Sequence, residues 1–431
     1  MSSPTGQTSE SAATGSKRFA RDVWWNVGSL AVAGLCGILL NVSIGIWYDP
    51  DALGIFNQVF AFYILFSQVA VLGFQYSVLT YASASDDPTE RKAITTTALV
   101  ITALVGAGFA LVLWLASDVV GHVLDSPEVA RGLRYTAPGI FFFALSKVSL
   151  ACLNALRRMR WYAIFFGGRF VAMIAAFGAC AALAVDRAVL PVILTVAEAA
   201  TFVLSLPTIR TELGRVGRAA MRRWAAQHVR FGTKGMTAGI LSELNTRVDI
   251  LTLGLFASDA IVGAYSFAAI LVEGAYQLLI VLRTNYAPIA VRLWVEGRRG
   301  ELALEIRRAR NRTYVGSLAI GALSVAGYVV LLPLVTSDPT LLASWQYFAV
   351  LMAGVVATAG YAPFQPMLLY AGFPGWHTVL TLGIVAVNTG GNFVLIAAMG
   401  PIGAAVATAI AFLFGVALLR WLARRFLAIR M

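Results

Sequence analysis

Charged side chains inside apolar stretches are the residues of this chain best suited to chemistry, and the densest group lies within residues 234–256. That stretch is apolar enough to cross a membrane, yet its middle holds Glu243, Asn245, Arg247 and Asp249. A charge at the centre of a bilayer costs about 2.5 to 3.5 kcal/mol, so three would largely cancel the apolar drive for insertion. These side chains must therefore face protein or a water-filled path that can hold an ion or an ionic substrate.

The spacing of these four residues defines two polar faces of one helix. Glu243 and Arg247 stand at positions i and i+4, so they are able to pair on one face. Asn245 and Asp249 form a second such pair about 200° round the helix. The helix is therefore expected to have polar neighbours on both faces.

Other apolar stretches carry further charges. They are Lys147, Arg169, Glu198, Glu273 and Arg283. Such residues normally mark a substrate or ion path, although they can also form neutralising pairs that only hold helices together. Asp249 and Glu273 lie in successive stretches, at depths that differ by roughly 9 Å at helical rise. We expect them to be separate acidic stations of one cavity, where a proton or sodium ion would bind.

Enzymatic and metal-binding patterns are weak in this sequence. A dinucleotide-binding glycine motif follows a β-strand, and no strand precedes Gly106-Ala-Gly108, so this pattern does not predict a dinucleotide site. His122, His228 and His377 fall in separate loops, which argues against a metal cluster. No nucleophile with a positioned base is visible. We expect no enzymatic activity, no metal site and no cofactor.

The composition is that of a membrane protein. Hydrophobic residues make up 59% of the chain, charged residues only 13%, and the mean hydropathy is +0.77. Soluble domains carry about 25% charged residues. The net charge of +12 would suit nucleic acid, but the basic residues are distributed by membrane side, which favours a topological role. We expect an all-α polytopic membrane protein that binds no nucleic acid.

Apolar runs of spanning length occur twelve times. They cover residues 23–47, 54–82, 93–116, 135–156, 161–184, 189–207, 234–256, 260–290, 313–335, 344–371, 378–399 and 402–422. When the first run starts inside, most of the 33 Lys and Arg residues fall on one face, and the other face is mainly acidic. This positive-inside pattern places both termini in the cytoplasm.

The twelve runs divide into two halves of six. Asp51-Ala-Leu-Gly-Ile-Phe56 after the first run resembles Asp259-Ala-Ile-Val-Gly-Ala-Tyr265 after the seventh, although such likeness also arises by chance in apolar sequence. An even number of spans gives both halves one orientation, so a pseudo-two-fold axis runs along the membrane normal, as in transporters. The expected domains are a disordered cytoplasmic tail (1–22), an N-terminal six-helix lobe (23–207), a cytoplasmic amphipathic connector (208–233) and a C-terminal six-helix lobe (234–431).

Several motifs resemble the polysaccharide transporter family, a Wzx-like group of oligosaccharide flippases. The most specific is Asn245-Thr-Arg-Val-Asp-Ile250 followed by Val262-Gly-Ala-Tyr265-Ser-Phe-Ala268. The remaining motifs are Glu273, Ala287-Pro288, Gly54-Ile-Phe56-Asn57 and Leu72-Gly-Phe-Gln75. The resemblance covers nearly the whole chain. The superfamily also holds multidrug extruders and lipid II flippases.

The resemblance implies a V-shaped bundle of two six-helix lobes around a central cavity lined mainly by the first, second, seventh and eighth spans. It also implies a bacterial cytoplasmic (inner) membrane flippase that moves an oligosaccharide linked to polyprenyl diphosphate to the outer leaflet by alternating access. Glycosyltransferases or a polymerase of the same pathway would be partners, and the chain is expected to be a monomer. Lipid II flippases have extra C-terminal spans and several arginines in early spans, which this chain lacks, so lipid II is disfavoured as the substrate.

A diphosphate must stay neutralised while its sugar crosses, and the planar fork of arginine donors matches phosphate oxygens. Arg247 and Arg283 are therefore the main candidates for substrate binding. The further candidates for that role are Arg169, Lys147 and Asn245. The candidates for coupling or charge balance are Asp249, Glu273, Glu243 and Glu198, with a proton or sodium as the coupling ion.

Two other functions stay open. A cation- or proton-coupled multidrug extruder would use an acid-lined, aromatic cavity, which the four acidic residues permit. A non-transporting scaffold of a glycan-synthesis complex would move no substrate in purified vesicles.

Overall fold

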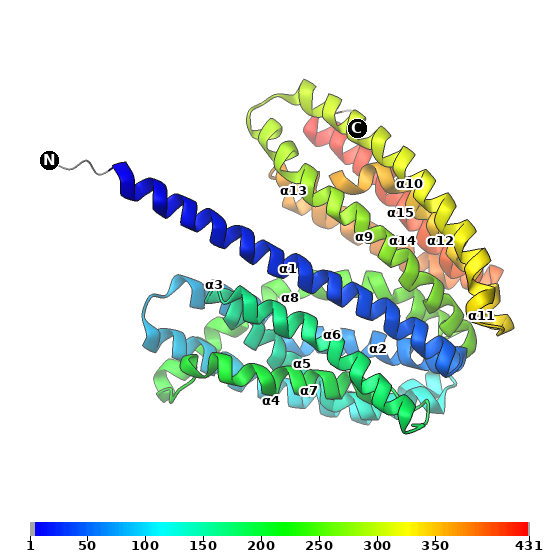
Figure 1. The fold of residues 1–431 in the computed structure, drawn as a ribbon, viewed down its shortest axis with the longest axis horizontal. Coiled ribbons are helices and arrows are strands. Elements are labelled where there is room, and N and C mark those ends of the chain that lie inside the picture. Colours follow the sequence, from blue (N-terminus) through cyan, green and yellow to red (C-terminus); the bar gives the residue numbers. More distant parts are fainter. Residues whose placement is uncertain (1–4, 430–431) are drawn as a thin grey trace. The chain divides into compact units, whose positions relative to one another are not determined.

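The computed structural model describes residues 5–429, except for the side chains of residues 5–20, 23, 234, 235, 237–239 and 242. Within that part all regular secondary structure is helical and no strand occurs (Figure 1). The expected all-α fold is confirmed. The tail expected at residues 1–22 lies largely outside the described side chains, while the backbone of the first helix begins at Thr5.

The helices of the first half follow the apolar runs closely. They are α1 (Thr5–Trp47), α2 (Pro50–Val71), α3 (Phe74–Ala84), α4 (Pro88–Val123), α5 (Pro127–Ala155), α6 (Met159–Ala182), α7 (Val192–Ile209), the 3-10 turn η1 (Arg210–Glu212) and α8 (Arg218–Leu253). Helix α8 is continuous from the basic connector into the segment expected as the seventh span.

The second half contains longer helices and more interruptions. They are α9 (Asp259–Val295), α10 (Arg299–Val335), α11 (Pro339–Ala343), α12 (Trp345–Thr358), the 3-10 segment η2 (Ala359–Phe364), α13 (Met367–Tyr370), α14 (Pro374–Met399), α15 (Ile402–Leu422) and the π turn η3 (Ala423–Leu427). Pro363 lies inside η2 and Pro366 precedes α13, and these two prolines interrupt the helix of the tenth span.

Eleven helical segments of the described part are long and apolar enough to span a membrane, so the chain is a multi-pass membrane protein. The segment expected as the seventh span is not among the eleven. Its middle carries Glu243, Arg247 and Asp249, and these charges lower its hydropathy. Two of these charged residues, Arg247 and Asp249, line the cavity of unit 2.

The chain forms two compact units. Unit 1 comprises residues 1–40, 63–119 and 130–240, and unit 2 comprises residues 41–62, 120–129 and 241–431. In unit 1, α6 packs along α7, and in unit 2, α14 packs along α15, which contacts α12 (Figure 1). Helix α12 also contacts α9 and α10. Unit 2 thus holds a helical bundle together with the junction of α1 and α2.

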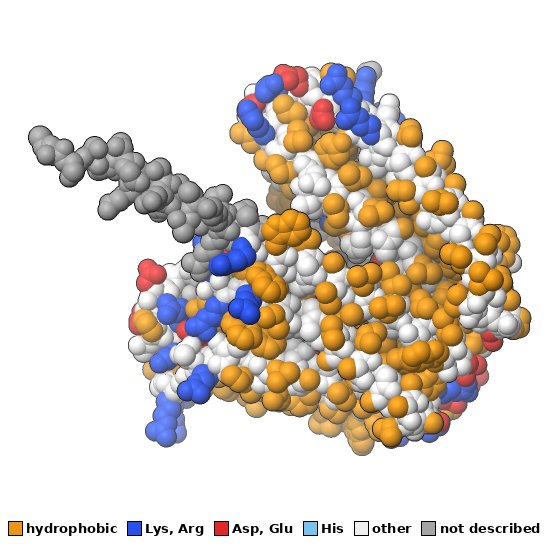
Figure 2. Space-filling model, viewed as in Figure 1, with side chains coloured by type: hydrophobic (Ala, Val, Ile, Leu, Met, Phe, Trp, Pro, Cys, Tyr) orange, Lys and Arg blue, Asp and Glu red, His pale blue; other side chains and the backbone are white. Residues whose placement is uncertain are grey.

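The outer flank of α10 is apolar and suits contact with lipid. Val315, Leu323 and Leu334 are 73%, 75% and 78% exposed. Figure 2 shows hydrophobic side chains along this flank, whereas Lys and Arg side chains gather at the end of unit 2 where α10 begins. A lipid-facing helix needs this distribution, because exposed apolar residues are stable in hydrocarbon and charges are stable at its edge.

The second span is interrupted between α2 and α3, although the apolar run 54–82 predicts one helix. Leu72 and Gly73 have φ angles of 48° and 70°, which end α2 in the left-handed region. A methyl group on Gly73 would lie 2.5 Å from the carbonyl oxygen of Gly232 in α8. Backbone contact between α8 and this turn therefore requires glycine at both positions.

Two glycines bring α2 and α9 into backbone contact within unit 2. A methyl group on Gly54 would lie 1.8 Å from the carbonyl oxygen of Asp259, and one on Gly263 would lie 1.9 Å from that of Pro50. Beside this crossing, the Asp259 carboxylate accepts hydrogen bonds from Gln58 Nε2 at 2.6 Å and Ser126 Oγ at 2.7 Å.

Gly54→Ala is expected to lower the thermal stability of the purified protein strongly, because backbone atoms cannot move aside for a methyl group as a flexible side chain can. Overpacking typically costs about 1 to 3 kcal/mol even where side chains absorb it. Gly390→Ala is the matched control in the same unit, since a methyl group there meets nothing within 4 Å. Equal melting temperatures for the two variants would show that the contact of α2 with α9 does not hold the fold.

His228 fastens the first part of α8 to the core of unit 1. Its side chain is 0% exposed and packs against Phe74 and Trp224. Nε2 lies 3.1 Å from the carbonyl oxygen of Ile94, so Nε2 carries the proton, and Nδ1 then accepts from Ser77 Oγ at 2.7 Å. Burial lowers the pKa of His228 from 6.5 to about 4.

The depressed pKa of His228 predicts acid-sensitive stability. Between pH 6.5 and about 4 the unfolded chain binds a proton that the folded imidazole does not. Its contribution is therefore complete above pH 6.5 and is lost as the pH falls toward 4, by about 3 kcal/mol at most. His228→Phe keeps the ring packing without the titration, so its melting temperature should fall less between pH 7.5 and pH 4.5 than that of the wild type. Parallel pH profiles would contradict this assignment.

Candidate functional site

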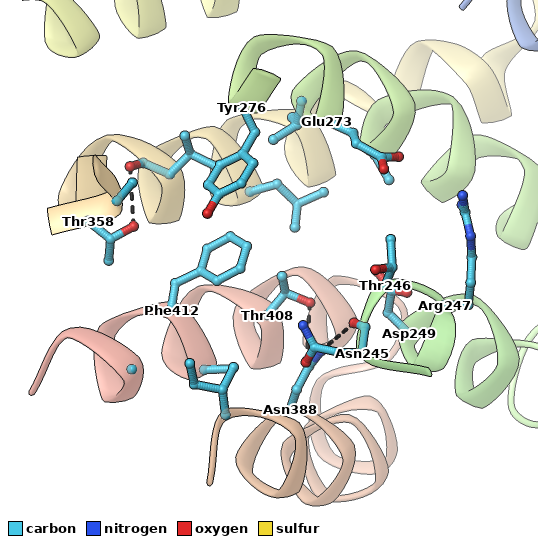
Figure 3. A pocket seen from close by; sticks show the side chains of 18 of the residues that line it. Asn245, Thr246, Arg247, Asp249, Glu273, Tyr276, Thr358, Asn388, Thr408 and Phe412 are labelled. Carbon is cyan, nitrogen blue, oxygen red and sulfur yellow. Dashed lines mark hydrogen bonds between the residues drawn. The ribbon is translucent and has the colours of Figure 1, made fainter. Parts of the chain in front are cut away.

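A polar cavity of about 410 Å³ lies within unit 2. Its lining comes from α8, α9, α12, η2, α14 and α15, together with Asn57 of α2 (Figure 3). Residues of the segments expected as the second, seventh and eighth spans line this cavity, together with residues of the segments expected as the tenth, eleventh and twelfth spans. Its size lies in the range of about 300 to 1,000 Å³ that is common for small-molecule sites.

Arg247 enters the cavity from α8, and it makes no ion pair with a carboxylate in the part of the chain that the structure describes. Its guanidinium carbon lies 5.1 Å from the centre of the Phe60 ring, a cation–π contact. Its Nε is buried and has no hydrogen-bond partner among the described residues. A positive charge with unused donors therefore borders the cavity.

Asp249, one turn from Asn245 on α8, is fixed by the neighbouring helix. Tyr265 of α9 donates to Asp249 Oδ2 at 2.6 Å, and the backbone N–H of Ile250 donates to Oδ1 at 2.9 Å. Tyr265 is 0% exposed. This carboxylate is therefore anchored by a buried hydroxyl as well as lining the cavity.

Glu273 differs from Asp249 in having no such anchor. It extends from α9 into the cavity (Figure 3), and it makes no hydrogen bond or ion pair with another described residue. Asp249 and Glu273 thus line the same cavity. The Asp249 carboxylate is held by Tyr265, whereas the Glu273 carboxylate is available to a ligand or ion.

Asparagine and threonine side chains join α8 to α14 and α15. Asn388 Nδ2 donates to the backbone carbonyl of Asn245 at 3.3 Å, and Thr408 Oγ1 donates to Asn388 Oδ1 at 3.4 Å (Figure 3). Asn392, one turn further on α14, donates to the same Oδ1 at 3.0 Å. Asn245 Oδ1 is buried without a partner among the described residues. The network leaves this amide oxygen able to accept from a ligand.

The cavity also contains an aromatic pair. The rings of Tyr276 on α9 and Phe412 on α15 have centroids 6.1 Å apart and an interplanar angle of 13°. Gln277 and Gln365 line the same cavity. Aromatic faces beside amide groups suit a ligand with both apolar and hydroxyl-bearing surfaces.

Sequence reasoning missed these uncharged residues because it sought charges inside spans. The signal was present as Asn388 and Asn392, which stand at i and i+4 in an otherwise apolar run and are 4% and 0% exposed. Buried amides in a membrane helix need partners, so this spacing predicts a polar neighbour. The aromatic residues gave no signal that distinguished them from lipid-facing or core residues.

Two predicted site residues of unit 2 lie outside the cavity lining. Arg283 is half-buried on α9, and its positive charge interacts electrostatically with Tyr276 and His377. Glu243 is half-buried on α8. Neither is brought into the group formed by Asn245, Arg247, Asp249 and Glu273.

Three predicted residues form a separate charged cluster in unit 1. Arg169 Nη1 pairs with Glu198 Oε1 at 3.1 Å, and the two side chains are 13% and 1% exposed. The Lys147 ammonium lies over the Phe143 ring at 5.2 Å, and its charge also acts on Glu198. Phe143 contacts Arg169 as well, at 5.6 Å. Arg169 is thus neutralised by a buried carboxylate, which is the helix-holding role that the sequence left open.

Among the described residues no group of three or more His, Cys, Asp or Glu side chains is arranged to hold a metal ion. The three cysteines, Cys36, Cys152 and Cys180, are free.

Residues 19–294 match the family model described as "Polysaccharide biosynthesis protein". No curated protein sequence matches the chain. Solved structures with a similar fold include the lipid II flippase MurJ in an inward closed conformation, with 14% identity and a TM-score of 0.73 over 93% of this chain and 87% of that one. An inward-facing multidrug resistance MATE family transporter of the MOP superfamily has 15% identity and a TM-score of 0.70 over 90% and 94% of the two chains.

A MOP superfamily transporter from Pyrococcus furiosus, described by the reverse polarity of its binding pocket, is also similar. It has 13% identity and a TM-score of 0.64 over 95% of this chain and 96% of that one. These likenesses establish the fold, which is that of two-lobed MOP superfamily transporters.

Proposed function

This chain belongs to the polysaccharide biosynthesis protein family, and on that basis we propose that it is a flippase for a polyprenyl-diphosphate-linked oligosaccharide. It moves the head group from the inner to the outer leaflet by alternating access. The lipid tail stays in the bilayer, so the protein shields only the diphosphate and the sugar.

Arg247 is the observation that carries this proposal. Its guanidinium group faces the cavity, contacts a ring rather than a carboxylate, and keeps a buried donor unused. Arg247 is half-buried, and a sheltered charge that makes no ion pair with a described carboxylate is stabilised when a ligand supplies the opposite charge. A diphosphate does so with several oxygens, which match the planar donors of arginine.

The rest of the cavity suits the sugar. Asn245 offers a buried carbonyl oxygen without a partner, and the amides of Gln277 and Gln365 supply further donors and acceptors. The stacked Tyr276 and Phe412 rings give an apolar face for the C–H side of a sugar ring. This mixed lining supports a glycan head group more than a purely apolar drug.

We place the protein in a bacterial cytoplasmic membrane with both termini in the cytoplasm. Support comes from the basic end of unit 2 in Figure 2 and from the distribution of Lys and Arg along the chain. Glycosyltransferases or a polymerase of the same pathway are the partners that this function requires. We expect a substrate other than lipid II, because the early spans lack the several arginines that the resemblance implies for lipid II flippases.

Glu273 favours a second candidate, a cation- or proton-coupled multidrug extruder. Its carboxylate lines the cavity that also holds Tyr276 and Phe412, and no described residue pairs with it, so it can bind a lipophilic cation. In the flippase, the same carboxylate is the station for a coupling proton or sodium ion.

Ligand charge separates the two functions. Purified protein in nanodiscs is expected to bind a polyprenyl diphosphate carrying a short oligosaccharide, and Arg247→Ala should weaken that binding while Glu273→Gln should not. Tetraphenylphosphonium serves as the cationic probe. Saturable binding of this cation that disappears in Glu273→Gln, with no binding of the anionic lipid, would favour the extruder.

A further inference from the structure

A second arrangement of arginines stands at another end of the cavity. Tyr361 of η2 lines the cavity, and its ring has an arginine from each of two helices beside it. Arg310 of α10 lies 5.8 Å from the ring centre and Arg420 of α15 lies 5.7 Å from it. Figure 3 shows Thr358, the residue before η2, on the side of the cavity opposite Arg247.

Neither of these arginines has a carboxylate partner among the described residues, although both are half-buried. Arg310 Nη1 donates to the Tyr361 hydroxyl at 3.3 Å, and Arg420 Nε is buried without any partner. The exposed Arg292 and Arg298 at the same end of the unit are paired with glutamates at 2.7 Å. Arg310 and Arg420 thus differ from Arg292 and Arg298, because they are more sheltered and lack a carboxylate among the described residues.

The surrounding fold holds Arg310 in place. A methyl group on Gly360 would lie 2.6 Å from Arg310 Cγ and 2.5 Å from Tyr314 Cε2, so only glycine lets both side chains cross η2. Tyr314 in turn donates to the carbonyl oxygen of Ala357 at 3.0 Å. The arginine stem is therefore confined by packing, as in a preorganised binding site.

We propose that Arg310, Arg420 and the Tyr361 hydroxyl bind the phosphate group of a lipid at this end of the cavity, as a site separate from Arg247. Two guanidinium groups and a hydroxyl offer several donors to one oxyanion. A ring contact alone offsets only part of the cost of sheltering a guanidinium group from water, so a phosphate oxyanion would stabilise both arginines further. If the lipid is the diphosphate substrate, the proposal rests on the proposed function. The substrate would then bind at this site before it reaches Arg247.

The test uses the full chain carrying Arg247→Gln, so that binding at Arg247 does not mask the second site. The protein is placed in phosphatidylcholine nanodiscs and titrated with a short polyprenyl diphosphate without sugar, or with phosphatidylglycerol. Arg310→Gln combined with Arg420→Gln is expected to weaken binding of the anionic lipid at least tenfold. Arg424→Gln, which removes an exposed arginine just after α15, is the control and should leave the affinity unchanged.

The two lipids identify the source of the phosphate. Binding of the diphosphate alone, lost in the double variant, assigns the site to the flippase substrate. Binding of phosphatidylglycerol with the same loss assigns it to bilayer lipid, and this result would uphold the site even if the proposed function failed. The proposal would be overturned if the double variant bound both lipids as tightly as its parent, or if neither lipid bound to the parent.

Arg310→Lys with Arg420→Lys keeps both charges and protects the test against a folding defect. This variant should bind more weakly than the parent protein, because a point charge lacks the planar donor fork. If the glutamine variant does not fold and the lysine variant binds as tightly as its parent, the site assignment is wrong.

Discussion

Arg247→Ala is expected to reduce translocation of lipid-linked oligosaccharide by about 100-fold while leaving membrane insertion intact. A pair of charge-assisted hydrogen bonds to phosphate contributes roughly 3 kcal/mol, which corresponds to that factor. Loss of the side chain also leaves the diphosphate charge uncompensated beside Phe60. The measurement is the initial rate of translocation in proteoliposomes that contain equal amounts of folded protein.

Arg247→Lys should recover only part of the rate, since an ammonium group cannot make the bidentate contact. Arg307→Ala, on an exposed position of α10, controls for the loss of a positive charge. An alanine variant of Arg247 as fast as wild type would reduce this residue to a dispensable packing contact.

Glu273→Gln is expected to uncouple transport from its driving ion. The glutamine keeps the size and hydrogen bonding of the side chain but removes its negative charge and its titration. Among the described residues no ion pair gives Glu273 a purely structural role. A coupling ion must bind the inward-open and outward-open states unequally, because equal affinity shifts no population. We therefore expect the rate of the variant to lose its dependence on pH, sodium and membrane potential.

Asp249→Asn tests whether the anchored acid has the same role. Asparagine can still accept from Tyr265, so the fold should survive and only the charge is lost. If both variants transport at the wild-type rate with unchanged ion dependence, the coupling role is wrong for both acids.

The sequence predicted the helical spans well because hydropathy and length are local properties. It missed the break at Leu72 and Gly73, since that break depends on contact with Gly232, far away in the chain. From Arg218 on, the connector also proved continuous with the seventh span in one helix, because its Ala, Arg, Met and Gln residues are good helix formers.

The candidate site was recoverable only where the relevant residues lie close along the chain. Asn245, Arg247 and Asp249 share one helix, and Glu273 follows in the next helix, so their convergence needed little tertiary information. The pairing of Arg169 with Glu198 and the position of Arg283 depend on how separate helices are rotated, which periodicity does not specify in spans that are apolar all round. Asn388 was overlooked because it carries no charge.

Translocation of a fluorescent polyprenyl-diphosphate oligosaccharide in proteoliposomes is the most direct measurement of the central claim. A membrane-impermeant quencher added outside reports which leaflet holds the label. Wild-type protein is expected to move the label between leaflets until the quenchable fraction changes, and the Arg247→Ala protein and protein-free vesicles should leave it unchanged. Equal quenchable fractions in wild-type and protein-free vesicles, with correctly folded protein present, would contradict a flippase.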